Sequence, residues 1–318
     1  MHHAPSRGRY GHPLLRALIL TGFAMLIVYL VRSGNLGLYI APRMELYVKL
    51  SALGLYATAV YQYYAAFRAW TGRQTEADCD CGHDHEPPSG LMKNVLVYGL
   101  FALPLLLGFL LPDTTMGSSL AAKKGVSFSS SEQLGASVPA APSPALAAPL
   151  PAAGQTTEPG GGAVGETGLD ALFPSDEYTA TYADHAKKLY VAREVSVPEE
   201  FYIETLTTLD LYRDRLEGIR VEISGFVYRE EAMAGTRFAV SRFAMNCCSA
   251  DAMPYGMLVD FPNASRYADD EWVKVTGTMK LGRYQDNEVM TLQATMIERI
   301  EAPDTPYVYP NYEFGLEP

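Results

Sequence analysis

The sequence predicts a chain of two parts, an α-helical membrane part with three spans and an all-β C-terminal domain. The first observation is three long apolar runs in the first third of the chain. The second is an alternation of apolar and polar residues in the last third, which is typical of strands. We therefore expect a membrane domain over 1–128, an unstructured linker over 129–168 and a small OB-like barrel with a short flanking helix over 169–318.

The apolar runs cover 14–31, 46–67 and 95–111. Each approaches the roughly 20 residues that an α-helix needs to cross a bilayer core. The first run has the charged lead of a signal peptide, but no small-x-small cleavage site follows Val31 and two more runs come after it. We therefore interpret it as an anchor of a multi-pass protein of the cell membrane.

Basic residues beside the runs favour one orientation under the positive-inside rule. A cytoplasmic N-terminus places six of them inside, namely Arg7, Arg9, Arg16, Arg68, Arg73 and Lys93. It places four outside, namely Arg32, Arg43, Lys123 and Lys124. An odd number of spans then makes the C-terminal domain extracytoplasmic.

The linker and the charge of the last half restrict the function further. Residues 129–168 are rich in Ala, Pro and Gly, so they bury too little apolar surface to offset the entropy of ordering. Residues 165–318 carry 14 Lys and Arg against 27 Asp and Glu, a net charge of −13. A surface of that sign repels phosphate backbones, which disfavours nucleic-acid binding.

The segment "EADCDCGHDHE", 76–86, lies between the second and third runs. It places Cys79, Cys81, His83 and His85 within seven positions, between acidic residues. Thiolate and imidazole are the ligands that zinc and similar divalent ions prefer. The alternating spacing differs from C-x-x-C, so we expect a site of transient capture; the other interpretation is a solvated, charged turn.

The C-terminal domain carries strand signals with interior glycines, among them "IRVEISGFVYRE" and "DEWVKVTGTMKLG". Five short strands with glycine at their bends favour an OB-like barrel. The segment "VSVPEEFYIETLTTLDLYRDRLEG" ahead of them combines one strand with the flanking helix.

Cys247 and Cys248 stand at the end of the strand "FAVSRFAM". Adjacent strand residues point to opposite faces, so both thiols reach one ion only if a turn redirects one of them. Asp251, Pro254 and Gly256 favour such a turn. Three interpretations stay open: a metal or thiol-reactive site that includes Asp251, buried core cysteines, or a strained vicinal disulfide.

The runs "GFVYRE", "RFAMNCCSADAMPYG", "DEWVKVTGT" and "APDTPYVYP" resemble the YcgQ family of permease subunits, bacterial membrane proteins paired with a polytopic permease. The resemblance extends to "YIAPRM", the Cys/His loop and "LPLLLGFLLPDTTMGSSLAAKKG". It implies an accessory subunit of a two-part transporter, with associations to divalent-metal and especially zinc homeostasis.

The leading hypothesis is therefore a non-enzymatic transport subunit with a polytopic permease as its partner. One alternative is an extracytoplasmic thiol redox protein, in which Arg242 would have to lower the thiol pKa because the motif holds no His or Lys. Another is a purely structural, partner-binding membrane protein. We find no P-loop, no G-x-G-x-x-G after a strand, no G-x-S-x-G and no H-E-x-x-H, which makes catalysis the weakest class.

The orientation can be tested with reporter fusions. Alkaline phosphatase fused after Pro318 is expected to be active in a bacterial host, because the three spans and the charge bias place this end outside the cytoplasm. An inactive phosphatase fusion together with a fluorescent cytoplasmic reporter at the same position would reverse the topology.

The Cys/His loop can be tested as a peptide that covers 76–86. Calorimetry is expected to detect one bound Zn²⁺, with an affinity that falls as the pH is lowered and the ligands take up protons. Replacing Cys79 and Cys81 together by serine should weaken binding strongly. An unchanged affinity in that variant would rule out thiolate ligation.

Overall fold

The computed structural model describes residues 8–71, 91–111, 125–128, 166–230, 233, 235–285 and 287–316. The chain forms two compact units, which are described separately below. The first comprises Met1–Thr115 together with Cys247–Ser249. The second comprises Met116–Asn246 and Ala250–Pro318.

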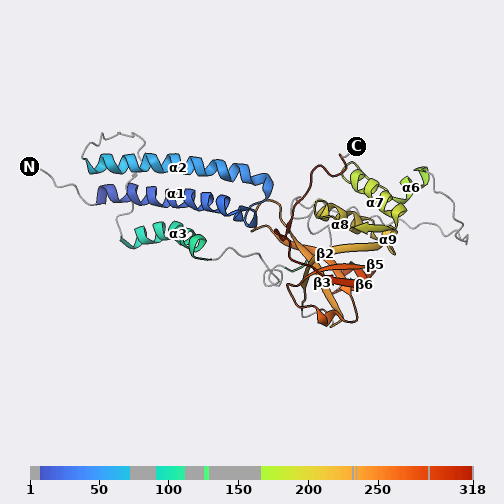
Figure 1. Cartoon of the computed structure of the whole chain (residues 1–318). Helices are drawn as coiled ribbons and strands as arrows, with labels where there is room; N and C mark the ends of the chain where they lie inside the picture. The colour runs from blue at the N-terminus through green and yellow to red at the C-terminus, as the bar shows by residue number, and fades with distance from the viewer. Residues whose placement is uncertain are drawn as a thin grey trace, which may run out of the picture. The chain divides into compact units, whose positions relative to one another are not determined.

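The first unit is helical, as Figure 1 shows. Its elements are α1 (Gly8–Ser33), the short 3-10 helix η1 (Asn35–Leu38), α2 (Pro42–Trp70) and α3 (Leu91–Leu110). Proline at the first position of α2 favours a helix start there. An N–H group in the first turn has no intrahelical acceptor, so proline loses no hydrogen bond at this position. All three apolar runs are thus helical.

Helices α1 and α2 pack through small side chains. Ala17 and Ala24 of α1 are buried, and so are Ala52, Ala59 and Ala66 of α2, all at intervals of seven residues. Small residues allow two helix backbones to approach closely, which is the common way for helices to associate in a membrane. The alanine rows therefore explain why α1 and α2 lie side by side.

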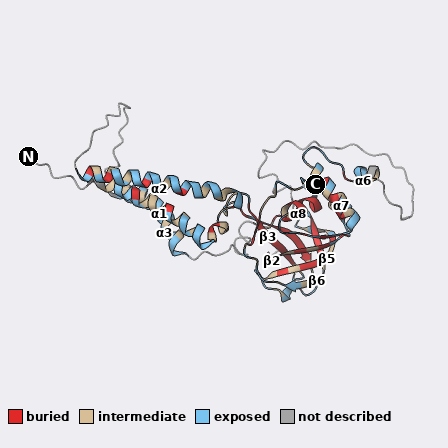
Figure 2. Cartoon of the chain, turned by 45° about the horizontal axis from the view of Figure 1, so that its top comes forward, coloured by how far each residue is buried: buried red, intermediate tan, exposed pale blue. Residues whose placement is uncertain are grey.

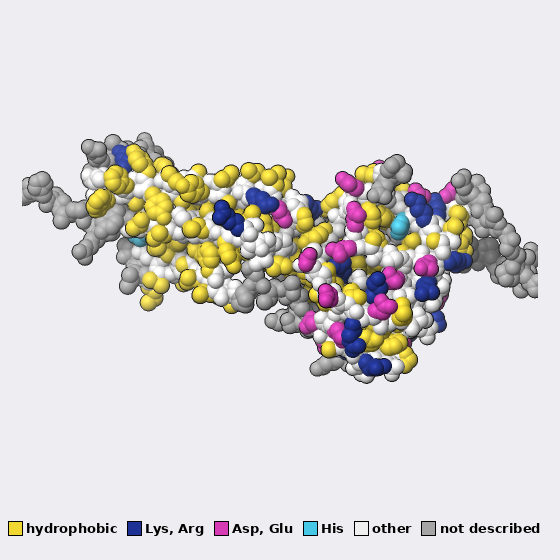
Figure 3. Space-filling model, in the orientation of Figure 1, with side chains coloured by type: hydrophobic (Ala, Val, Ile, Leu, Met, Phe, Trp, Pro, Cys, Tyr) yellow, Lys and Arg dark blue, Asp and Glu magenta, His cyan; other side chains and the backbone are white. Residues whose placement is uncertain are grey.

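Among the described residues, two helical segments have the length and hydropathy to cross a membrane, Gly11–Ser33 and Met92–Leu110. The expectation of three spans is not met by this criterion, because α2 is not among them. Its length of 29 residues suffices, but tyrosines, Lys49 and Gln62 lower its hydropathy. The face of this unit visible in Figure 3 is largely covered by hydrophobic side chains.

The second unit combines helices with a mixed seven-stranded sheet. Its helical elements are α6 (Glu166–Leu172), α7 (Ala180–Ala192), α8 (Tyr202–Leu211), α9 (Arg213–Leu216) and η2 (Ala264–Arg266). Its strands are β1 (Glu194–Ser196), β2 (Arg220–Tyr228), β3 (Arg237–Ala244), β4 (Met253–Asp260), β5 (Trp272–Tyr284), β6 (Asn287–Arg299) and β7 (Tyr307–Val308). Helix α6 begins at residue 166, inside the stretch 129–168 that we expected to be linker throughout.

The strands lie in the order β1-β2-β5-β6-β4-β3-β7, and β2 also pairs with β3. That extra pairing joins the two ends of the row β2-β5-β6-β4-β3. Most neighbours in this row are antiparallel, whereas β4 and β6 run parallel. Strands β1 and β7 are added in parallel, to β2 and β3 respectively.

Two glycines allow three strands to meet at Ser241. A Cβ on Gly225 of β2 would lie 2.4 Å from the Ser241 carbonyl oxygen. A Cβ on Gly256 of β4 would lie 2.0 Å from the Val240 carbonyl oxygen. No side chain fits at such separations, so these positions require glycine, as interior strand glycines often do where backbones approach closely.

The core of the second unit lies between the inward faces of the strands and α8. Figure 2 shows the buried strands together with that helix. Strands β2–β6 supply mostly branched aliphatic and methionine side chains, and α8 adds Leu206 and Leu209, which are fully buried. Burial of this apolar surface is the main term that stabilises the domain.

The short segment 125–128 belongs to the second unit. The Ser127 N–H donates to the Pro254 carbonyl at 3.0 Å, and Ser127 pairs in parallel with Tyr255 of β4. Phe128 is buried and packs edge-on against Tyr284. The described residues on both sides of 129–165 therefore lie in this unit.

Glu204 on α8 is a buried carboxyl group, 4% exposed. Its Oε1 accepts a hydrogen bond of 2.7 Å from the Asn311 N–H, whereas its buried Oε2 has no hydrogen-bond partner. Burial raises the pKa of Glu204, and the Asn311 N–H offsets part of that rise. The fold therefore favours the protonated form.

The stability of the second unit should depend on the ionisation of Glu204. Because its pKa is raised above the ordinary 4.5, its contribution is complete below that pH and is lost as the pH rises through the folded value. Glu204→Gln cannot ionise and should flatten this decline. The control is Glu200→Gln, since Glu200 accepts an exposed hydrogen bond of 3.4 Å from the Asn311 side chain.

Urea unfolding of the full chain in detergent, at several pH values, measures this difference. Trp272 fluorescence reports the second unit once the other tryptophan is removed by Trp70→Phe. An equal pH slope in the parent and in Glu204→Gln would contradict the assignment.

Candidate metal centre

The candidate site lies in the turn between β3 and β4. The last pair of this antiparallel hairpin is Ala244 with Met253, so residues 245–252 form the connection. Strand β3 ends at Ala244, so Met245 and Asn246 separate it from the cysteines. A turn therefore follows β3 and contains Asp251, as the sequence predicts, but Pro254 and Gly256 lie in β4 and not in the turn.

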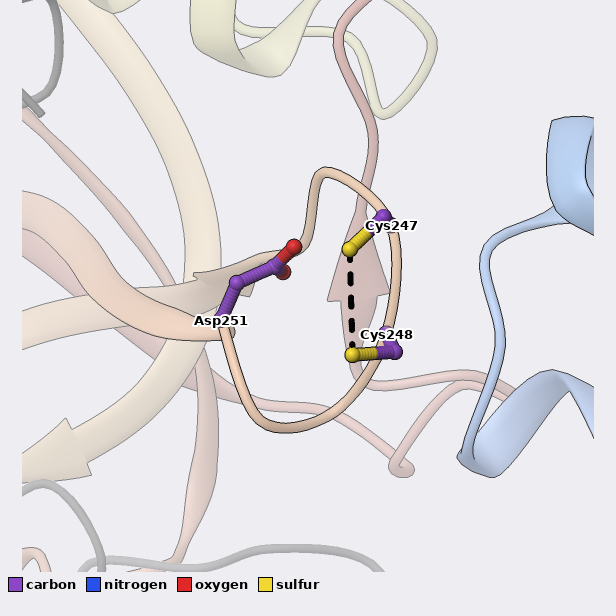
Figure 4. Close-up of side chains that lie close together, drawn as sticks. All are labelled: Cys247, Cys248 and Asp251. Carbon is purple, nitrogen blue, oxygen red and sulfur yellow. Dashed lines mark hydrogen bonds between the residues drawn. The ribbon is translucent and has the colours of Figure 1, made fainter. Parts of the chain in front are cut away.

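The turn brings three of the predicted ligands together. The sulfur atoms of Cys247 and Cys248 lie 3.7 Å apart. The Asp251 carboxylate lies across the turn from them, and the three ligand atoms are all within 4.8 Å of one another (Figure 4). The redirected turn thus overcomes the alternation of side chains that would separate adjacent cysteines in a strand.

The separation of the two sulfur atoms matches the geometry of a zinc site. With Zn–S bonds of about 2.3 Å and a tetrahedral angle, two thiolate ligands are about 3.8 Å apart. The observed 3.7 Å therefore allows one ion to contact both sulfurs with little movement. Two thiolates and one carboxylate form a ligand set suited to Zn²⁺ or a similar divalent ion.

The burial and the sulfur separation describe the state of the two cysteines in this structure. Neither forms a disulfide and both are half-buried, so they do not belong to the closed core of the domain. A disulfide needs about 2.05 Å between its sulfur atoms. The separation of 3.7 Å is that of two thiols in contact.

Asp251 is oriented by Asn246, the second residue of the turn. The Asn246 N–H donates to Asp251 Oδ1 at 3.0 Å, which closes the turn between positions 246 and 251. A carboxylate has two oxygens and about four acceptor positions, and the Asn246 N–H occupies one of them. Asp251 is half-buried, as the cysteines are.

The backbone around the cysteines is paired within the first unit. The Ala41 N–H donates to the Cys247 carbonyl at 3.0 Å, and the Ser249 N–H donates to the Tyr39 carbonyl at 2.8 Å. An antiparallel bridge joins Ile40 to Cys248 between them. These bonds satisfy main-chain groups of the turn and involve neither thiol.

Arg242 lies outside this cluster of ligands. It is 2% exposed, and its guanidinium donates to Glu199 at 2.9 Å and to the Thr305 carbonyl at 3.3 Å. The ring of Trp272 lies 5.4 Å from the guanidinium carbon. Since Arg242 is committed to these groups, the structure gives no support to a role in activating the thiols.

The other predicted ligands, Cys79, Cys81, His83 and His85, lie outside the described residues. Sequence reasoning missed Asn246, although it precedes the cysteines and asparagine is common in turns. It also missed the pairing of residues 39–41 with the turn, for which no local signal exists.

Comparisons with known proteins agree with the two-part organisation. One family model, the DUF1980 N-terminal domain, matches residues 15–127, and another, the DUF1980 C-terminal domain, matches 172–310. The UPF0703 protein YcgQ of Bacillus subtilis (strain 168) is 28% identical over 312 residues, covering 93% of this chain and 99% of the relative. This chain belongs to the YcgQ-like family.

A second relative of this YcgQ-like protein comes from Streptococcus mutans serotype c and is named as a two-component membrane permease complex subunit. It is 24% identical over 306 residues, covering 93% of this chain and 99% of the relative. That name and the two apolar helices support an association with the membrane.

A solved structure, the small single-stranded DNA-binding protein from Streptomyces coelicolor, is 17% identical and covers 26% of this chain and 93% of its own. Its TM-score of 0.18 is too low to bear on fold or function.

Proposed function

We propose that this YcgQ-like protein is the accessory, non-enzymatic subunit of a two-part membrane permease, and that its Cys247, Cys248 and Asp251 receive a zinc-like divalent ion as the cargo. The observation that carries the proposal is the 3.7 Å between two half-buried sulfur atoms, with a carboxylate within 4.8 Å. A divalent ion at this position would bind ligand atoms that the fold already brings together.

The number of ligands favours exchange of the ion over permanent storage. Structural zinc sites generally have four protein ligands, whereas sites with three keep a position open for water or another ligand. The three ligands from this turn leave such a position. A ligand from a partner subunit could enter there and take the ion over.

The membrane part is proposed to cross the bilayer three times. Helix α2 packs against α1 through the alanine rows, so it crosses with α1 although its own hydropathy is lower. With a cytoplasmic N-terminus, the Cys/His loop at 76–86 gathers ions inside and the second unit lies outside. Three helices seldom enclose a pathway, so a polytopic partner supplies the route.

The second unit is proposed to be an OB-like barrel. Its closed row of five strands, with one parallel pair between β4 and β6, supports that assignment. Strands on a closed row present their connecting turns at its ends, where side chains are accessible. The β3–β4 turn is one of these connections.

A thiol redox protein is the second candidate, because the two thiols of Cys247 and Cys248 are in contact in the turn. It requires their oxidation to a vicinal disulfide, which brings the sulfur atoms from 3.7 Å to about 2.05 Å. Redox cycling therefore predicts that both cysteines but not Asp251 are needed. Ion binding predicts that all three contribute.

Serine replacement of both cysteines separates the ion site from a role in packing. Cys247→Ser with Cys248→Ser nearly preserves volume but removes both thiolates, so the full chain should lose Co²⁺ binding, measured by thiolate-to-cobalt absorption, and metal-dependent transport in cells. Unfolding should change little, because both side chains are half-buried. If they were packing residues, each buried hydroxyl without a partner would cost about 1–3 kcal/mol.

Asp251→Asn is the matched variant for the carboxylate. The amide oxygen can still accept the hydrogen bond from Asn246, so the turn should persist while its negative charge is lost. Weaker Co²⁺ binding with unchanged disulfide formation supports the ion site. Unchanged Co²⁺ affinity would exclude Asp251 as a ligand.

A further inference from the structure

The C-terminal residues follow β3 as far as the start of the candidate site. Strand β7 pairs in parallel with the end of β3, with Phe243 opposite Tyr307 and Ala244 opposite Val308. The Met245 N–H then donates to the Val308 carbonyl at 2.9 Å. Main-chain bonds thus hold the chain up to the residue before Asn246.

Beyond β7, residues 311–316 form what we call the C-terminal strap. Its first anchor is Asn311, whose N–H donates to the buried Glu204 carboxyl at 2.7 Å. Its second anchor is Phe314, whose ring lies 5.6 Å from Tyr182, 5.1 Å from His185 and 5.6 Å from Phe201. Aromatic groups from α7 and from the residue before α8 therefore surround this side chain.

The strap also lies very close to the start of α7. Gly315 has a φ of +81°, which L side chains rarely adopt, and a Cβ there would lie 2.1 Å from Thr181 Cγ2. Only glycine meets both conditions. The strap is therefore a fitted segment with three separate points of attachment.

Between its anchors the strap reaches the candidate site through two successive hydrogen bonds. The Tyr312 hydroxyl donates to Asn246 Oδ1 at 3.4 Å. The Asn246 N–H in turn donates to Asp251 Oδ1 at 3.0 Å. The strap is thus connected through Asn246 to one of the three proposed ligands.

We propose that the C-terminal strap positions Asn246 and, through it, the Asp251 carboxylate, so that attachment of the strap raises the affinity of the Cys247, Cys248 and Asp251 site. This inference rests on the proposed function for its ion. Phe314 and Tyr312 act as positioning residues, since neither supplies a ligand. The strap lies beyond residues 172–310 matched by the C-terminal family model.

The test uses the full chain in detergent with Cys79→Ser and Cys81→Ser, so that thiolate absorption comes from the proposed site. Phe314→Ala removes the main anchor, and Leu316→Ala is the matched control because Leu316 is in the strap but 76% exposed. Titration with Co²⁺ alone should show about tenfold weaker binding for Phe314→Ala, a usual size of coupling between sites, and about no change for Leu316→Ala.

A second measurement does not depend on the ion. Without metal, maleimide should modify Cys247 and Cys248 several-fold faster in Phe314→Ala than in Leu316→Ala, because the released turn exposes its thiols. If the parent binds no Co²⁺, the proposal that this site binds a divalent ion is wrong. The alkylation rates then test the role of the strap by themselves. Equal rates in the two variants overturn the strap, as does an unchanged Co²⁺ affinity in Phe314→Ala.

Tyr312→Phe is a second variant, which keeps the test decisive if Phe314→Ala does not fold. It removes a single hydroxyl from a side chain that is 68% exposed, so the domain should remain folded. Weaker Co²⁺ binding or faster alkylation than in the Leu316→Ala control supports the connection through Asn246. If Phe314→Ala unfolds and Tyr312→Phe behaves as the control, the proposal is wrong.

Discussion

The close meeting of β2, β3 and β4 at Ser241 is the constraint on which the second unit depends. Gly225 and Gly256 each place a backbone where a Cβ would collide with the backbone near Ser241. Because Gly225 has no side chain, β2 can approach β3 and join the ends of the strand row, and because Gly256 has none, β4 can lie against β3 at Ser241. That closure fixes β3 and β4 and therefore the turn between them.

The turn itself is held at both ends by segments that are remote in sequence. β7 pairs with the end of β3, and Ser127 bonds to Pro254 at the start of β4. Neither segment supplies a proposed ligand. Their effect is to fix where the connection begins and ends, so that two thiols and a carboxylate can come together within it.

Two buried polar side chains of the second unit contact the C-terminal residues. Arg242 donates to the Thr305 carbonyl, and Glu204 accepts from the Asn311 N–H. A buried charge or carboxyl group that loses its partner is destabilising, so each of these contacts resists detachment of the segment that it holds. The same two residues lie on β3 and α8, which connects the core to the edge that carries the candidate site.

The sequence by itself determined the local structure: three helices, the alternating strands and a turn after Cys248. Each of these depends on residues a few positions apart, and so does the proposal that Cys247, Cys248 and Asp251 share a site. The number of membrane spans did not follow from the sequence alone, because the tyrosines of α2 lower its hydropathy. Its packing beside α1 is visible only in the structure. The role of the Ala/Pro/Gly stretch was also not evident, since the contact of Ser127 with β4 has no local signal.

Only the tertiary structure decided the closure of the strands, the attachment of Phe128 and the path of the C-terminal strap. These depend on contacts between residues that are far apart in the chain, such as Asn311 with Glu204 and Tyr312 with Asn246. The hydrophobic period and the composition of a segment indicate which of its faces is buried. They do not identify the segment that packs against that face. The physical reason is that such pairing depends on shape and hydrogen-bond geometry, which exist only once the chain has folded.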